Sequence, residues 1–226
     1  MESENLLPPL FLDSNVIVGH QLSPYHRISE PSDNIFQGNH PLWWSDKVRF
    51  ECYGHGKYHG VCHTQCRAFI KEILRIKYAI DNQTFSKEQL KQYKYLGKIV
   101  EKLLTEQNLT EEQLLIWLDL SLQSYRNNYN TKKAYILQRL TLHTREIDYP
   151  AITNRIKSLI SEAHIERDDS DIEIWLDAHD LAVTRDIKDL IFVSDNSTHV
   201  TKAAHIICDC TKINKIQELK NYCTQH

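Results

Sequence analysis

The chain has 226 residues, of which 41% are hydrophobic and 25% are charged, and its formal net charge is −3. These values are typical of a globular protein and exclude a fibrous or disordered chain. No stretch approaches the roughly 20 apolar residues of a transmembrane helix, and the first residues are unlike a signal peptide. We therefore expect a cytoplasmic protein with no membrane partner and with its six cysteines reduced.

The sequence pattern of the N-terminal part predicts two short strands, each followed by a helix. Leu10–Asp13 is an apolar run that ends in a carboxylate, and the helix after it is capped by Ser14 or Asn15. Leu42–Trp44 predicts the second strand, and the helix that follows contains Glu51. Both strands therefore lead into helices, as in a parallel α/β sheet.

The middle of the chain, residues 62–164, is net basic, whereas the rest is net acidic. Apolar residues recur there at helical spacing, and capping residues precede several of these stretches. The predicted helices cover about 64–80, 86–104, 110–122, 131–146 and 150–164. We expect a large all-helical insertion over 62–164.

Alternation of helices and strands returns after Glu166. The predicted elements are a helix at 168–184, a strand at 190–194, a helix at 197–204, a strand at 205–208 and a helix at 212–222. Short strands separated by helices predict an α/β fold with a central parallel sheet. The core is then discontinuous and consists of residues 1–60 and 165–226.

Four acidic residues lie next to apolar segments that are expected to be buried, where a carboxylate charge is costly. Asp13 and Asp195 end apolar strands, Glu51 follows the second strand, and Asp171 begins a helix with an apolar inward face. Carboxylates that converge repel one another, and a divalent cation removes this conflict. Oxygen ligands suit Mg²⁺ or Mn²⁺, which can support phosphodiester cleavage.

Each acid also has a simpler interpretation. Asp171 could cap its helix, and Asp195 with Asn196 could form a turn. Glu72 competes with Glu51 for the role of second acid. Considered together, at strand ends and helix starts of one α/β pattern, the acids favour a shared site.

These residues resemble the PIN-domain nucleases. The resemblance rests on Leu-Asp-Ser-Asn-Val-Ile-Val (12–18), Trp-Ser-Asp-Lys-Val (44–48) with Glu51, Asp-Ile-Glu-Ile-Trp-Leu-Asp-Ala (171–178) and Phe-Val-Ser-Asp-Asn (192–196). It implies a three-layer α/β/α fold and an endoribonuclease that cleaves RNA with Mg²⁺ or Mn²⁺. It also implies that Asp13, Glu51, Asp171 and Asp195 are the catalytic and metal-binding acids, with Asn15 and Asn196 in supporting roles.

The resemblance has consequences for partners. Some PIN domains are toxins of toxin–antitoxin pairs, so a small antitoxin-like protein and a homodimer are candidate partners besides RNA. Such toxins look shorter than this chain, and the helical insertion is an addition to their pattern.

A second constellation, rich in Cys and His, lies between residues 52 and 66. Its six candidate zinc ligands are Cys52, His55, His59, Cys62, His63 and Cys66. These residue types can form a tetrahedral Zn²⁺ site, but the spacing fits no common zinc-binding pattern. The alternative is a loop near the acidic site.

Five lysines follow one another at intervals of three or four residues: Lys87, Lys91, Lys94, Lys98 and Lys102. On a single helix they would share one face and could contact RNA phosphates. The alternative is an ordinary solvated helix face.

Two other functions compete with the metal-dependent ribonuclease. An aspartyl-nucleophile phosphatase would need a second acid two residues after Asp13, where this chain has Asn15. A non-catalytic adaptor with a PIN-like fold could instead bind RNA or protein through the insertion. Metal binding at the acids distinguishes the nuclease from the adaptor.

Overall fold

The computed structural model describes residues 7–166, 169–196, 200 and 202–223. Its centre is a five-stranded parallel sheet in the order β5-β2-β1-β6-β7. The strands are β1 (Leu10–Leu12), β2 (Leu42–Ser45), β5 (Thr141–His143), β6 (Ile191–Ser194) and β7 (Lys215–Glu218). The chain is therefore α/β, as the sequence predicts, and its architecture is compatible with three layers.

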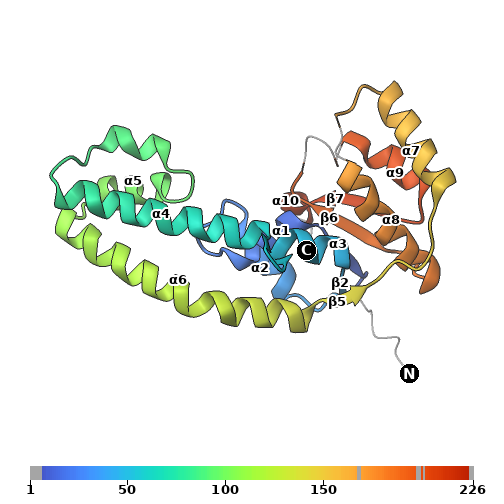
Figure 1. The fold of residues 1–226 in the computed structure, drawn as a ribbon, viewed down its shortest axis with the longest axis horizontal. Coiled ribbons are helices and arrows are strands. Elements are labelled where there is room, and N and C mark those ends of the chain that lie inside the picture. Colours follow the sequence, from blue (N-terminus) through green and yellow to red (C-terminus); the bar gives the residue numbers. More distant parts are fainter. Residues whose placement is uncertain (1–6, 167–168, 197–199, 201, 224–226) are drawn as a thin grey trace.

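Helices cover both faces of the sheet. One group contains α1 (Ser14–Gln21), α2 (Ser29–Gln37), α3 (Asp46–Tyr53) and α10 (Leu219–Cys223), and the other contains α7 (Pro150–Glu162), α8 (Asp169–Thr184) and α9 (Lys202–Cys210). α2 packs against α1 and α10, whereas α7 packs against α8 and α9. The two groups lie on opposite sides of the strands (Figure 1), as right-handed crossovers require.

The middle strands lie in the hydrophobic core because helices cover both faces of the sheet. All three residues of β1 are buried, and Phe11 stacks on Phe192 of the neighbouring strand. In α8 the residues Ile174, Trp175 and Ala178 of the predicted inward face are buried, but so is every residue from Ile174 to Ala182, so the helix is enclosed on all sides. Continuous apolar strands of this kind are typical of a parallel sheet between two helical layers.

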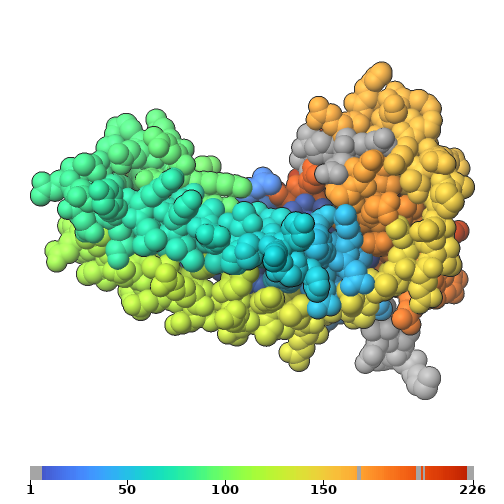
Figure 2. All heavy atoms as spheres, in the orientation of Figure 1, coloured from blue at the N-terminus to red at the C-terminus, as the bar shows by residue number. Residues whose placement is uncertain are grey.

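A helical arm extends from this body (Figure 1). It is built from α4 (Val61–Asp81), the 3₁₀ helix η1 (Lys87–Gln92), α5 (Gly97–Thr105) and α6 (Glu111–Arg139). α4 packs against α6, and α5 packs against η1. Between the arm and α7 the surface is concave (Figure 2).

The structure corrects three predictions within 62–164. The predicted helix at 86–104 is interrupted, because η1 ends at Gln92 and α5 starts at Gly97. The two predicted helices at 110–122 and 131–146 are one helix, α6, which stops at Arg139. Residues 141–143 form β5, and this strand pairs with β2 at the edge of the sheet. The all-helical arm therefore ends before β5.

The C-terminal part also differs from its prediction. The predicted strand at 205–208 lies within α9, and the predicted helix at 212–222 contains β7 before α10 begins. The start of the predicted helix at 197–204 lies outside the described residues. Within the described residues, no helix is long and apolar enough to cross a membrane.

Candidate functional site

Asp13 is the centre of the candidate site, at the carboxyl end of β1. It is buried and caps α1 by accepting a 2.6 Å hydrogen bond from the Ser14 backbone N–H. Its other oxygen accepts hydrogen bonds from the Ser194 hydroxyl at 2.6 Å and from the Asn15 side-chain amide at 3.0 Å. Burial outweighs these bonds and raises the pKa of Asp13 above its ordinary value.

Asn15 connects Asp13 to the end of the neighbouring strand. Its amide nitrogen donates to Asp13 and to Ser194 Oγ at 3.2 Å, and its carbonyl accepts the Asp195 backbone N–H at 2.9 Å. The Asn196 backbone N–H donates to Ser194 Oγ at 3.0 Å. The supporting role expected for Asn15 therefore has a physical basis, while Asn196 contributes through its backbone.

The Asp195 carboxylate faces a cation from a distant part of the chain. Arg27 Nη2 lies 2.6 Å from Asp195 Oδ2. The Asp195 side chain is 3% exposed, whereas that of Arg27 is 71% exposed. Asp195 is therefore neutralised by an arginine that is itself mostly in solvent.

Glu51 and Asp171 complete the acidic group. Burial raises the pKa of Glu51, and the negative charges of Asp13 and Asp171 raise it further, against a Ser14 hydrogen bond and Lys47. Repulsion of this kind requires the Glu51 carboxylate to lie within electrostatic range of each of the other two. Glu51 therefore links Asp13 and Asp171 into what we call the acidic cluster, at the carboxyl ends of β1 and β2.

Glu72 is not part of this cluster. Its carboxylate accepts the backbone N–H groups of Lys94 at 2.8 Å, Tyr95 at 2.9 Å and Leu96 at 3.0 Å. These three bonds satisfy backbone donors in the segment between η1 and α5. Glu72 thus stabilises the arm, which leaves Glu51 as the glutamate beside Asp13.

The donor chemistry of the cluster suits a hard divalent cation, because its ligating atoms are carboxylate, hydroxyl and amide oxygens. Burial and, after it, the charges of Asp13 and Asp171 raise the pKa of Glu51, and a bound cation would oppose both effects. Among the described residues, however, no three His, Cys, Asp or Glu side chains are already arranged as ligands. The acids would have to move closer together to hold a metal.

The raised pKa of Glu51 leads to a testable pH dependence. A carboxyl whose folded pKa exceeds its unfolded value binds its proton more tightly in the native state, so its stabilising contribution is lost as the pH rises above about 4.5. In EDTA, we expect Glu51→Gln to gain stability relative to the wild type between pH 4.5 and 7.5. Solvent screening should limit this gain to about 1 kcal/mol or less.

Urea unfolding of both proteins at the two pH values measures the difference. The comparison with the variant is needed because other groups titrate in the same range with opposite sign. His26, for example, has its pKa lowered to about 4, chiefly by burial. If the difference in free energy of unfolding between the wild type and Glu51→Gln is the same at both pH values, the raised pKa of Glu51 is contradicted.

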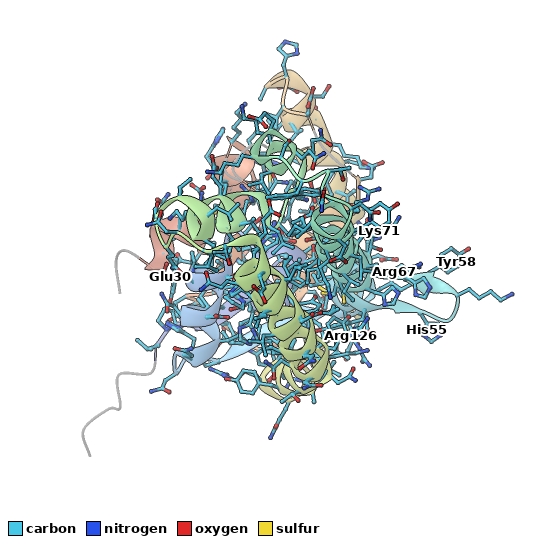
Figure 3. The ribbon with its side chains drawn as sticks, turned by 90° about the vertical axis from the view of Figure 1, so that its left-hand side faces the viewer. Glu30, His55, Tyr58, Arg67, Lys71 and Arg126 are labelled. Atoms are coloured by element: carbon cyan, nitrogen blue, oxygen red, sulfur yellow. The ribbon has the colours of Figure 1, made fainter. Side chains whose placement is uncertain are left out.

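The six candidate zinc ligands are not brought together. Cys52 and Cys62 are buried next to each other, whereas His55 lies on the exposed hairpin of β3 (Gly54–His55) and β4 (Tyr58–His59). Figure 3 shows this hairpin projecting from the body with His55 pointing outward. His59 and His63 stack at 4.3 Å. These described residues therefore form no tetrahedral site.

The five lysines do not lie on one helix, because Lys94 falls in the segment between η1 and α5. Four of them nevertheless line the same cavity, of about 510 Å³: Lys87, Lys91, Lys94 and Lys98. Lys102 is exposed and does not line it. Arg27, the partner of Asp195, lines the same cavity.

Sequence reasoning missed three residues of the site. The order of strands alone could have drawn attention to Ser194, since it precedes Asp195 at the end of β6. Asp177 is buried one turn and a half after Asp171, and burial raises its pKa despite a Ser45 hydrogen bond. Arg27 lies in a loop, and no local pattern indicates its contact with Asp195.

The site therefore combines a buried hydrogen-bonded aspartate, a glutamate in the field of Asp13 and Asp171, and an arginine-paired aspartate beside a cationic cavity. Acids at the carboxyl ends of parallel strands occupy the usual ligand position of open α/β sheets. Comparisons of this chain with protein-family models, with curated proteins and with solved structures gave no match.

Proposed function

We propose that this protein is a Mg²⁺- or Mn²⁺-dependent endoribonuclease with a PIN-like three-layer α/β/α fold. The observation that carries the proposal is the hydrogen-bonded network in which Asn15 and Ser194 join the buried Asp13 to Asp195, directly after β6, with Glu51 in the field of Asp13 and Asp171. A cation bound there would lower the pKa of water and neutralise charge on a phosphodiester.

The protein's own residues have separate roles in this proposal. Asp13, Asp171 and Asp195 would hold the cation, and Asn15 and Ser194 fix the direction in which Asp13 points. Glu51, with its raised pKa, would complete the site and orient the attacking water. Attack by water at phosphorus with the 3′ oxygen leaving yields 5′-phosphate and 3′-hydroxyl ends.

The direct test is incubation of the purified protein with a single-stranded RNA in Mn²⁺ and in EDTA. We expect cleavage only with Mn²⁺, and products that carry 5′-phosphate ends. Cleavage that persists in EDTA, or products with 2′,3′-cyclic phosphate, would overturn the proposed chemistry.

Cation binding should also be visible as stabilisation. With Mn²⁺ at 100 times its Kd, linkage gives about 2.7 kcal/mol, or roughly 5 to 10 °C in Tm for a chain of this size. We expect Asp195→Ala to reduce this shift strongly, because it removes one ligand. Thermal unfolding of both proteins with and without Mn²⁺ measures the effect, and an equal shift in the variant would contradict the assignment of Asp195.

The adaptor remains the alternative function, favoured by the exposed apolar side chains of the arm. Leu74 and Tyr78 on α4, with Ile116 and Leu120 on α6, are between 50% and 70% exposed. Exposed apolar residues at this spacing can form a protein-binding surface, for an antitoxin-like partner or a second copy. RNA or protein binding without Mn²⁺ binding at the acids would favour this function.

A further inference from the structure

The cavity between the body and the arm is the feature that the proposed nuclease site does not explain. One wall is the loop Pro24–Arg27, and the other is formed by η1, α5 and the segment between them. Its volume of about 510 Å³ lies within the range of about 300–1,000 Å³ that is typical of small-molecule sites. The cavity is therefore large enough for a nucleotide.

The lining of the cavity is strongly cationic. Arg27 and four lysines line it, against a single acid, Glu101. The field of these cations is felt by His26, whose pKa is lowered to about 4 by burial and by the charges of Arg27 and Lys94. An anionic group would relieve this concentration of positive charge.

Aromatic side chains accompany the cations. Tyr25, Tyr93 and Tyr95 all line the cavity, and Lys94 Nζ lies 5.4 Å from the centre of the Tyr95 ring. Aromatic rings that can stack on bases, combined with cations that can contact phosphates, are typical of sites for single-stranded nucleic acid. The aromatic rings would not be needed for a simple inorganic anion.

Arg27 connects this cavity to the acidic site. It lines the cavity and at the same time pairs with Asp195 at 2.6 Å. The Arg27 side chain is mostly exposed and can turn away into solvent, whereas the buried Asp195 carboxylate then needs another cation in its place. While the pair is made, one oxygen of Asp195 is occupied by a guanidinium rather than by a cation ligand.

We propose that the cavity holds one nucleotide of a single-stranded RNA, and that the phosphate of this nucleotide draws Arg27 away from Asp195. Asp195 is then released to join Asp13, Glu51 and Asp171 around the divalent cation. This inference rests on the proposed function and assigns Arg27 as a positioning residue that couples RNA binding to metal binding. By linkage, RNA and Mn²⁺ must then strengthen each other's binding.

The coupling can be measured without any cleavage. We would titrate Mn²⁺ into the full chain, following the free ion by electron paramagnetic resonance, with and without a hydrolysis-resistant phosphorothioate hexauridylate. We expect the RNA to tighten Mn²⁺ binding to the wild type by about fivefold or more. Arg27→Ala should bind Mn²⁺ more tightly than the wild type without RNA, and the RNA should then change its affinity less than about twofold.

Arg75→Ala is the matched control, because Arg75 is an exposed arginine of α4 that does not line the cavity. It should show the full wild-type coupling. Unchanged Mn²⁺ affinity in the wild type on adding RNA, or full coupling in Arg27→Ala, would overturn the inference. If RNA tightens Mn²⁺ binding but is not cleaved, the inference stands and the nuclease proposal is overturned. If RNA is cleaved but does not change Mn²⁺ affinity, the nuclease proposal stands and the inference is overturned.

The cavity itself can be tested in EDTA with two lysines of α5. We expect Lys98→Ala to weaken binding of fluorescein-labelled hexauridylate and to lower the dependence of log K on log salt by about 0.7. Lys102→Ala should bind within about twofold of the wild type, because Lys102 does not line the cavity. Fluorescence anisotropy at several salt concentrations measures both, and equal losses in the two variants would place the RNA elsewhere.

Discussion

Asp13→Asn should lower the rate of Mn²⁺-dependent RNA cleavage by about 10² to 10³-fold, the usual cost of removing one preorganised charged or polar group from an active site. The Asp13 carboxylate is held by Ser14, Asn15 and Ser194, so no neighbouring acid can take its position without breaking these bonds. An amide keeps the shape of the side chain but loses its negative charge. Cleavage of a labelled single-stranded RNA under single-turnover conditions measures the loss.

The stability of the same variant separates function from folding. Asparagine removes the cost of burying a charge, but it also places an amide next to two donors, Asn15 and Ser194. These effects oppose each other, so we expect the free energy of unfolding to change by only about 1 kcal/mol. An inactive variant that unfolds like the wild type therefore identifies a functional carboxylate.

Asp46→Asn is the matched control for this experiment. Asp46 follows β2 at the same edge of the sheet, but it is exposed and accepts a 2.6 Å hydrogen bond from Thr144. Cleavage by this variant should stay within about twofold of the wild type. Full activity of Asp13→Asn, or an equal loss in both variants, would remove Asp13 from the centre of the site.

The middle of the sheet could be predicted from the sequence because its strands are buried on both faces. β1, β2 and β6 are short apolar runs that end at polar residues, and this pattern does not depend on distant contacts. The acids at these strand ends could therefore be proposed before their positions were known.

The edge strands could not be predicted in the same way. β5 and β7 each pair with only one neighbour, and most of their residues are exposed or half-buried. Their sequences, Thr-Leu-His and Lys-Ile-Gln-Glu, carry no long apolar run and fit a helix as well as a strand. Hydrogen bonding to β2 and β6 decides their conformation, and this information lies far away in the chain.

The contacts made by Arg27 and Glu72 show the same limit within the candidate site. Arg27 meets Asp195 across a separation of 168 residues, and Glu72 binds a segment more than 20 residues further along. A sequence shows which charges exist but not which partner neutralises each one. For this reason the sequence favours Glu51 as the second acid but leaves Glu72 as a competing candidate, whereas the fold shows Glu72 bound to the arm.

Glu72→Gln should lower the free energy of unfolding by about 2 to 3 kcal/mol, because a buried carboxylate that accepts three backbone N–H bonds is replaced by a side chain with one acceptor. The segment Lys94–Leu96 then loses part of its anchor, and this segment forms a wall of the cationic cavity. Mn²⁺ affinity should nevertheless stay within about twofold of the wild type, since Glu72 lies outside the acidic cluster. Urea unfolding and Mn²⁺ titration measure the two properties separately.

For Glu51→Gln we expect the opposite: unchanged stability and weakened Mn²⁺ binding. At pH 7.5 it should unfold no more easily than the wild type, because it removes a carboxylate that burial and neighbouring acids already disfavour. Its Mn²⁺ affinity should fall by about tenfold or more, as expected for the loss of a charged group that supports the metal ligands. The reverse result, with weakened Mn²⁺ binding in Glu72→Gln and normal binding in Glu51→Gln, would make Glu72 the second acid. The pair of variants therefore decides which glutamate serves the cation and which one holds the arm.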